Sequence, residues 1–278
     1  LKKIFALPSR TTLTNLLNKV PLVCGINEAI LQSFAANASK MSHLNKFCTL
    51  IFDEVAIEPS LIYNPRADKI DGFQDNGSRS RRPLLADKAM VFVLRGMHAK
   101  WKQPIAYYFN DGGMKSDRLV AVLKDVICKV RQTGFLIKAT VCDQGTPNVK
   151  AIKMLIEETN MICKRKGEEN RYFGFLVDEE EIVPLYDVPH LLKGIRNNFY
   201  QHDRCEFKWK SAVCETTSWE HIKRPYDLDD KDEDYRLFHK LTEAHINNTK
   251  KNESEHCSVN FKLTCGCWDK ITNSHRYG

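Results

Sequence analysis

The sequence predicts an α/β fold in which helices flank one mixed sheet, and three observations support this class. Helical periodicity fills the first forty or so residues, apolar runs typical of strands occupy residues 47–110, and helices alternate with strands from about residue 115. The closely spaced early strands indicate antiparallel pairing, whereas the later strand–helix–strand unit indicates parallel pairing. With 278 residues, 42% hydrophobic and 28% charged, the chain can form one large domain or two ordinary ones.

The N-terminal elements follow from local composition. SRTTLTNLLNKV (9–20) opens with Ser and Thr cap candidates, and INEAILQSFAANASKMS (26–42) continues the helical spacing. FCTLIFDEVAI (47–57) is dense in β-branched and aromatic residues and predicts a buried strand, with SLIYN (60–64) as a second strand. Residues 64–88 are rich in Gly, Asp, Asn, Ser, Arg and Pro, so we expect mainly loop there, with one short strand near Ile70–Phe73.

The second half alternates helices and strands. Apolar residues at 3–4 spacing from Leu119 to Val130 predict an amphipathic helix over 115–134, ended by Gly134. The remaining elements are predicted from the same two periods: strands over 88–97, 103–110, 135–143 and 180–188, and helices over 148–160 and 189–200. From about residue 201 the pattern is helical and polar, with Trp209 and Trp219 as expected anchors.

Charge and hydropathy narrow the functional classes. A net charge of +7 permits contact with nucleic-acid phosphates without requiring it. The basic clusters at 78–83 and 164–166 are short, and an acidic run at 227–234 would repel phosphate. No window approaches 18 uninterrupted apolar residues, so no membrane span is expected. The N-terminus also lacks the apolar segment of a signal peptide.

The ten cysteines favour free thiols. Most stand alone inside apolar or helical stretches, as thiols do in a reducing compartment: Cys24, Cys48, Cys128 and Cys142. A zinc cluster is the alternative interpretation of the C-terminal group made of His256, Cys257, Cys265, Cys267 and His275. C-x-C with irregular partners is a weak metal signal, so unrelated thiols are the preferred interpretation.

Two acids carry the candidate chemistry. Asp53 lies within the apolar run LIFDEVAI, where a buried carboxylate is costly unless it is paired or binds a cation, and Asp143 ends the strand ATVCD. If these strands are neighbours, both carboxylates reach one edge of the sheet and suit Mg²⁺ or Mn²⁺, which support phosphodiester chemistry. The alternative is that Asp143 forms a turn or caps the helix after QGTPN, which composition alone favours. Glu54 alternates to the other face. We find no phosphate-binding glycine motif and no Ser–His–Asp or Cys–His signature.

Four blocks together resemble the P element transposase family, which includes the THAP-type transposases. In the family's order they are LIFDEVAIEPSLIYNPRADKIDGFQD, MVFVLRGMHAKWKQPIAYYF, ATVCDQGTPN and LYDVPHLLKGIRNN. The upstream IFALPSRTTLTNLL resembles the helical segment before the catalytic core. The downstream SWEHIKRPYDLDDKDEDYRLFHKLTEAHI resembles the start of the GTP-binding insertion domain.

The resemblance implies three regions: a helical segment over 1–44, the N-terminal part of a ribonuclease-H-like core over 45–187, and a partial, mainly helical insertion domain over 188–278. It also implies three acidic ligands for Mg²⁺ or Mn²⁺, which promote hydrolysis at the transposon end and strand transfer by the freed 3′-hydroxyl. The first acid matches Asp53 in FDEV, and the second matches Asp143 in CDQG. Lys193 and Arg196 are candidates for contacting GTP or a DNA backbone, against the alternative of a solvated basic helix face.

Three departures shape the functional hypothesis. The family's third acid follows the insertion domain and lies beyond this chain, the THAP zinc domain is missing, and the family pattern is lost after about residue 248. We therefore expect a fragment of a DDE/D-type transposase, inactive alone, from an oligomeric nuclear protein that acts on transposon ends and target DNA. The alternatives are a domesticated non-enzymatic module that binds DNA or protein, and a guanine-nucleotide-binding regulator.

Overall fold

The computed structural model describes residues 8–17, 23–65, 68–77, 81–208, 214–229 and 242–247. The chain divides into two compact units, Leu1–Leu185 and Tyr186–Gly278. None of the helices in these described ranges is long and apolar enough to cross a membrane.

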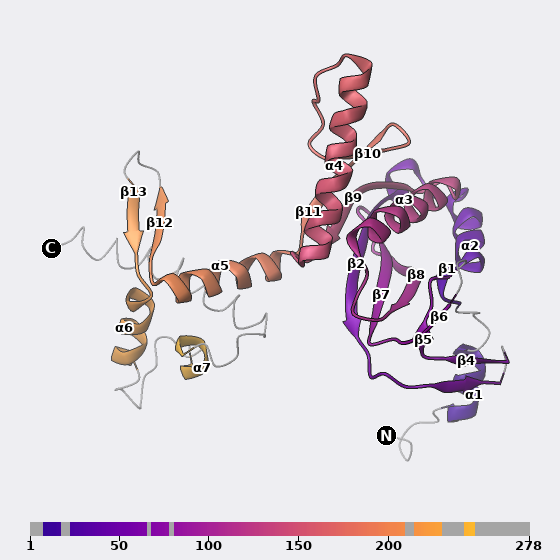
Figure 1. Ribbon diagram of the computed structural model, residues 1–278, viewed down its shortest axis with the longest axis horizontal. Helices are drawn as coiled ribbons and strands as arrows, with labels where there is room; N and C mark the ends of the chain where they lie inside the picture. Colours follow the sequence, from indigo (N-terminus) through magenta and orange to yellow (C-terminus); the bar gives the residue numbers. More distant parts are fainter. Residues whose placement is uncertain are drawn as a thin grey trace. The chain divides into compact units, whose positions relative to one another are not determined.

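The first unit is built on a seven-stranded sheet with strand order β1-β8-β7-β2-β9-β11-β10 (Figure 1). Its strands are β1 (Gly25–Ile26), β2 (Phe47–Ala56), β7 (Lys88–Gly96), β8 (Lys102–Asn110), β9 (Leu136–Cys142), β10 (Phe175–Val177) and β11 (Glu180–Tyr186). β2, β7 and β8 pair antiparallel, whereas β2 and β9 pair parallel. The predicted mixed sheet, with both kinds of pairing, is confirmed.

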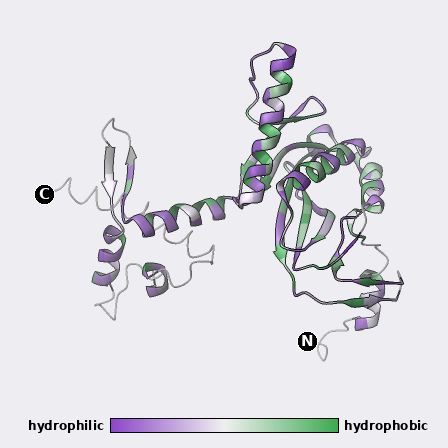
Figure 2. Cartoon of the chain, viewed as in Figure 1, coloured by the Kyte–Doolittle hydropathy of each residue, from purple (hydrophilic) through white to green (hydrophobic). Residues whose placement is uncertain are grey.

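Helices cover one face of this sheet, because that face carries mainly apolar side chains. Cys48, Leu50 and Phe52 of β2 are at most 1% exposed, and so are most of the apolar residues of α3 (Ser116–Gln132), including Leu119 and Val126. Figure 2 shows hydrophobic residues concentrated along the strands of this unit. The remaining helices of this unit are α1 (Arg10–Leu17), α2 (Glu28–Ala38), the short 3₁₀ helix η1 (His43–Lys46) and α4 (Thr146–Lys166).

Residues 25–38 pack on the core, although the sequence indicated a separate helical segment up to residue 44. β1 pairs with Tyr107 and Ala106 of β8. Phe34 of α2 contacts the rings of Trp101 and Phe135, with centroids 5.5 Å and 4.8 Å away. The two-residue strand and the aromatic cluster both depend on distant partners, which local periodicity does not reveal.

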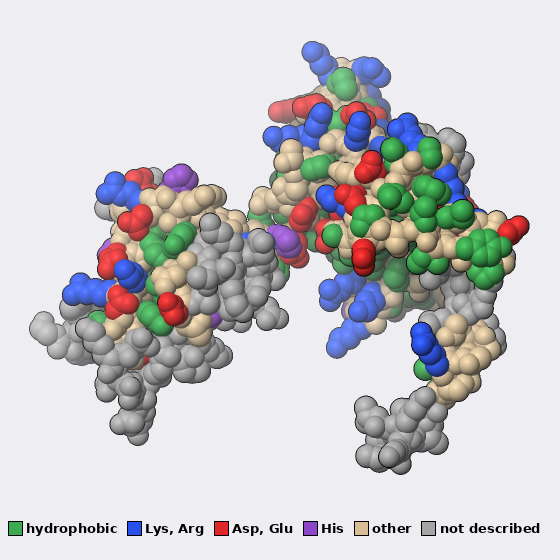
Figure 3. Space-filling model, turned by 60° about the horizontal axis from the view of Figure 1, so that its bottom comes forward, with side chains coloured by type: hydrophobic (Ala, Val, Ile, Leu, Met, Phe, Trp, Pro, Cys, Tyr) green, Lys and Arg blue, Asp and Glu red, His purple; other side chains and the backbone are tan. Residues whose placement is uncertain are grey.

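The segment predicted to be mainly loop holds two small antiparallel sheets, which include strands at the positions predicted, 60–64 and near Ile70–Phe73. They are formed by β3 (Ile62–Asn64) with β4 (Lys69–Asp71), and by β5 (Phe73–Gln74) with β6 (Arg82–Leu85). Arg81 ties them together, because Nε lies 2.7 Å from Asp75 Oδ2 and Nη1 donates to the Ile70 carbonyl at 3.0 Å. Apolar side chains here stay exposed, and Figure 3 shows hydrophobic side chains gathered over this unit.

The second unit contains α5 (Val188–His202), β12 (Cys205–Lys208), β13 (Cys214–Thr217), α6 (Glu220–Asp229) and α7 (Glu243–Ile246). The hairpin β12–β13 departs from the mainly helical pattern predicted for this region. Trp219 is confirmed as an anchor, since it is 7% exposed and packs against the rings of Phe199 and Tyr200. Trp209 and the C-terminal zinc candidates lie outside the described residues.

Buried thiols predict a loss of stability at alkaline pH. Cys24 and Cys48 are free, as predicted, and burial raises the pKa of Cys24 to about 11 and that of Cys48 to about 12. The folded state therefore keeps protons that the unfolded thiols release near their ordinary pKa of 9.0, and this contribution is lost as the pH rises from about 9 to 12. We expect urea unfolding to show lower stability at pH 10.5 than at pH 8, with a shallower decline in Cys48→Ala. An identical decline in both proteins would contradict this assignment.

Candidate metal centre

β2 and β9 place the two candidate acids on one face of the sheet. The strands are parallel neighbours, and Ile51 pairs with Val141. Two residues further along each strand, Asp53 comes opposite Asp143, the first residue after β9. Parallel strands lie roughly 4.8 Å apart, and side chains two residues apart share a face. The condition set for the metal hypothesis, that the strands be neighbours, is therefore met.

Asp143 forms the turn into α4. Its Oδ1 accepts hydrogen bonds from the Gly145 backbone N–H at 3.0 Å and from Asn148 Nδ2 at 2.6 Å. The turn interpretation is thus correct, whereas the N-cap of α4 is Gly145 itself. Both bonds engage Oδ1, and none of the described residues donates to Oδ2. The turn therefore holds the carboxylate in a fixed orientation and is compatible with metal binding through the second oxygen.

The closeness of this turn favours glycine at residue 145. A Cβ at residue 145 would lie 3.0 Å from Asp143 Oδ1 and 3.4 Å from Oδ2. A side chain there would crowd the carboxylate and disturb the hydrogen bond from the Gly145 N–H. The glycine thus serves the position of Asp143 as well as the direction of the chain.

Asp53 presents its carboxylate at the surface. The residue is exposed, and its Oδ1 accepts a hydrogen bond from the backbone N–H of Glu54 at 2.8 Å. The cost of burying a charge, which drew attention to Asp53 in the sequence, therefore does not apply. Glu54 points to the opposite face, as the alternation predicts, where it accepts from the Met114 N–H at 2.5 Å and lies 3.5 Å from Lys88 Nζ. Glu54 is a structural acid.

Burial and the negative charges of both acids raise the pKa of a nearby thiol. The pKa of Cys142 is raised to about 12, first by burial and then by the negative charges of Asp143 and Asp53. Two carboxylates with oxygen donors suit a hard cation such as Mg²⁺ or Mn²⁺, so the donor chemistry fits. Within the described ranges, no group of three or more His, Cys, Asp or Glu side chains is assembled for a metal.

The candidate nucleotide contacts lie elsewhere, on α5. Arg196 is only 4% exposed, and its Nε and Nη2 donate to Asn197 Oδ1 at 3.3 Å and 3.0 Å. The alternative of a solvated basic face is therefore wrong for Arg196. Lys193 on the same helix is half-buried. Nucleotide binding by these two residues stays a prediction.

Asn148 is the residue that the sequence did not single out. It is 7% exposed and orients Asp143 through its side-chain amide. The available signal was a polar amide in the first turn of an apolar-periodic helix, five residues after an acid. Such amides often bond to nearby side chains or backbone groups.

Replacing Asn148 by alanine should weaken any metal site without removing a ligand. Outer-shell partners typically contribute roughly 10- to 100-fold to metal affinity, so Mn²⁺ affinity should fall within that range. Loss of a buried hydrogen bond to a charged group should also lower stability by about 1–3 kcal/mol. Mn²⁺ titration and urea unfolding measure the two effects, with Asn37→Ala on the exposed side of α2 as the control. Unchanged Mn²⁺ affinity would remove Asn148 from the site.

A family model and a solved structure indicate the class of fold. Residues 22–156 match the family model described as TNP-like, RNase H N-terminal domain. The fold resembles the solved "Drosophila P element transposase strand transfer complex", with a TM-score of 0.64 and 24% identity over 96% of this chain and 55% of that one. The core is therefore ribonuclease-H-like.

Two curated relatives are similar to this chain in sequence. The chain is 29% identical over 247 residues to the Transposable element P transposase of Drosophila melanogaster, which covers 88% of this chain and 28% of the relative. It is 23% identical over 229 residues to human DNA transposase THAP9, a match that covers 80% of this chain and 24% of the relative. The chain is similar to these P element-type transposases, and the resemblance carried by the four sequence blocks is confirmed. It spans only about a quarter of the length of either relative.

Proposed function

We propose that this chain supplies two metal ligands, Asp53 and Asp143, to a P element-type transposase that acts on DNA. The observation that carries the proposal is the parallel register of β2 and β9, which sets both acids on one face of a ribonuclease-H-like sheet. Bound Mg²⁺ or Mn²⁺ would activate a water or hydroxyl nucleophile and stabilise the leaving oxygen of a phosphodiester.

The protein's own residues position this chemistry. Asp53 projects from the interior of a ten-residue strand, and Asp143 is held by Gly145 and Asn148 at the start of α4. Both acids therefore stand on rigid elements, as a site for in-line displacement requires. A third ligand would come from outside the described residues, as the family resemblance implies.

DNA is the proposed partner and the nucleus the proposed location. The structural relative was solved as a strand transfer complex, and the +7 charge of this chain favours polyanion contact. Because the chain covers 28% and 24% of its relatives, we assign transfer activity to a longer, oligomeric protein. GTP binding by the second unit belongs to the same proposal.

The test is a Mn²⁺-dependent nicking assay with the full-length product of the gene and its matching DNA end. We expect cleavage that is lost in both Asp53→Asn and Asp143→Asn and kept in Asp117→Asn, an exposed acid at the start of α3. DNA binding with no cleavage in any metal would instead support the domesticated, non-enzymatic module.

A further inference from the structure

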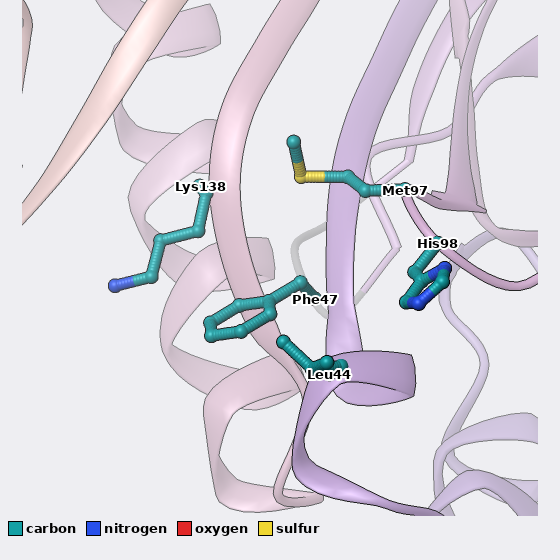
Figure 4. Close-up of a pocket in the computed structure, with 5 residues that line it drawn as sticks. All are labelled: Leu44, Phe47, Met97, His98 and Lys138. Carbon is teal, nitrogen blue, oxygen red and sulfur yellow. The ribbon is translucent and has the colours of Figure 1, made fainter.

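An open apolar groove lies at the amino end of β2 (Figure 4). The acids lie toward the other end of that strand. It encloses about 450 Å³ and is lined by residues of η1, β2, the β7–β8 turn and β9: Leu44, Phe47, Met97, His98 and Lys138. Leu44 and Met97 are each 57% exposed. Apolar side chains brought together in water in this way mark a surface suited to a ligand with an apolar part.

The backbone holds this groove in shape. The Met97 N–H donates to the Phe47 carbonyl at 3.0 Å, which fixes the β7–β8 turn beside β2. A Cβ at Gly96 would lie 2.3 Å from the Ala99 carbonyl oxygen, so only glycine permits the tight turn. On the other side, the pairing of β2 with β9 skips Lys138, whose Nζ lies 5.9 Å from the centre of the Phe47 ring. The groove is thus a preformed feature.

The surroundings of the groove are cationic and free of acids on β7 and β8. Residues 88–110 contain no Asp or Glu. Arg95 and Lys102 are exposed and directly opposite each other in the β7–β8 ladder, and Lys100 is exposed in the turn. Like charges facing each other across a ladder are unfavourable, and no described carboxylate forms an ion pair with any of the three.

Several other cations of this unit are paired with carboxylates. Within the described residues, carboxylates pair with Lys69, Arg81, Lys88, Lys124, Lys129, Arg131, Lys138 and Lys166. The β7–β8 end differs in that its exposed cations stand in a stretch, residues 88–110, without an Asp or Glu, so their charge is available to an external anion. We call Arg95, Lys100 and Lys102, together with the residues that line the cavity, the basic groove.

The basic groove and the acids share one sheet face. Along β2, Phe47 and Asp53 are six residues apart and point to the same side, and Arg95 pairs with Thr49 on that side. At roughly 3.3 Å per residue the separation along the strand is about 20 Å. That length corresponds to about six base pairs at 3.4 Å each. One nucleic acid lying along this face can therefore reach both ends.

We propose that the basic groove is a second nucleic-acid contact, at which an unstacked base lies against Phe47 and the neighbouring phosphates bind Arg95, Lys100 and Lys102. Aromatic rings combined with cationic side chains bind single strands through stacking and phosphate neutralisation. The groove would fix the strand at a point distant from the acids. The length between the two would then determine which phosphodiester reaches the acids. The proposal rests on the proposed function only for DNA as the substrate class.

The first test measures fluorescence anisotropy of the 278-residue chain with a labelled single-stranded oligonucleotide, in EDTA, over a range of salt concentrations. Lys100→Gln/Lys102→Gln should weaken binding several-fold and lower the salt slope by about 1.4, since each lost phosphate contact contributes about 0.7 for single strands. The matched control, Lys164→Gln/Arg171→Gln, removes the same charge from exposed positions at and beyond the end of α4. Equal slopes for the two double variants would overturn the proposal.

Lys102→Glu separates binding from folding. An acid opposite Arg95 replaces a repulsive pair by an attractive one, so the melting temperature should stay equal or rise while DNA affinity falls at least tenfold.

Phe47→Leu keeps an apolar side chain but removes the ring, and it should weaken single-strand binding about fivefold or more with the salt slope unchanged. Duplex binding should change less than twofold in this variant.

Three results would contradict the proposed nucleic-acid contact. Unchanged affinity in Lys102→Glu, or equal losses for single strand and duplex in Phe47→Leu, would overturn the contact. So would an acidic peptide that displaces the oligonucleotide at lower concentration than unlabelled DNA does. Because EDTA removes the metal, failure of Mn²⁺-dependent nicking leaves this result intact, and loss of groove binding leaves the nicking result intact.

Discussion

Asp143→Asn is expected to weaken divalent-metal binding by this chain strongly. The amide keeps the size of the carboxylate, and its oxygen can still accept the hydrogen bonds from Gly145 and Asn148, so the turn should persist. The lost charge removes a hard anionic ligand. Since outer-shell partners alone contribute 10- to 100-fold, we expect Mn²⁺ affinity to fall by at least roughly 100-fold. Electron paramagnetic resonance of free Mn²⁺ measures this directly.

The controls use the geometry of β2. Asp53→Asn should reproduce the loss, because Asp53 lies opposite Asp143 in the parallel pair. Glu54→Gln should leave Mn²⁺ affinity within about twofold, since Glu54 points to the other face and holds Met114 and Lys88. Equal effects of Asp53→Asn and Glu54→Gln would mean that the metal does not distinguish the two faces, contrary to the assignment.

Phe92→Ala is expected to cost the largest share of stability. Phe92 is fully buried, and its ring stacks on Phe52 at 5.8 Å and meets Tyr108 edge-on at 5.9 Å. Truncating a buried phenylalanine typically costs about 3–5 kcal/mol, a large part of the roughly 5–15 kcal/mol that stabilises a domain. Urea unfolding followed by circular dichroism measures the change.

A matched truncation on the surface calibrates this value. Leu85 of β6 is 47% exposed, so Leu85→Ala should cost less than about 1 kcal/mol. Similar losses in the two variants would show that the layer between β2, β7 and β8 is not the main core of the unit.

The sequence predicted the elements whose pattern is local. β2 and β9 are dense in β-branched residues, and α3 repeats its apolar side chains with helical spacing, so all three were found. The structure adds what distant partners create. β1 exists because Gly25 meets Tyr107, which is distant in the sequence. No short-range pattern contains that contact.

Some features of the candidate site were likewise visible in the sequence, and others required the fold. Alternation along β2 separated Asp53 from Glu54, and the strand end identified Asp143. The register of β2 with β9 and the bond from Asn148 required the fold. The sequence did not predict that Asp53 is exposed, because the apolar residues around it in the strand indicated burial. The acid-free stretch 88–110 was visible in the sequence, but its meaning depends on the groove that the β7–β8 turn forms.

The most direct test of the two-acid site is the anomalous signal of Mn²⁺ in crystals of this chain. A peak is expected between the carboxylates of Asp53 and Asp143, within about 2.0–2.3 Å of an oxygen of each, as hard cations require. This peak should disappear in Asp143→Asn. A peak that lies elsewhere, or one that persists in Asp143→Asn, would contradict the assignment of these two acids as metal ligands.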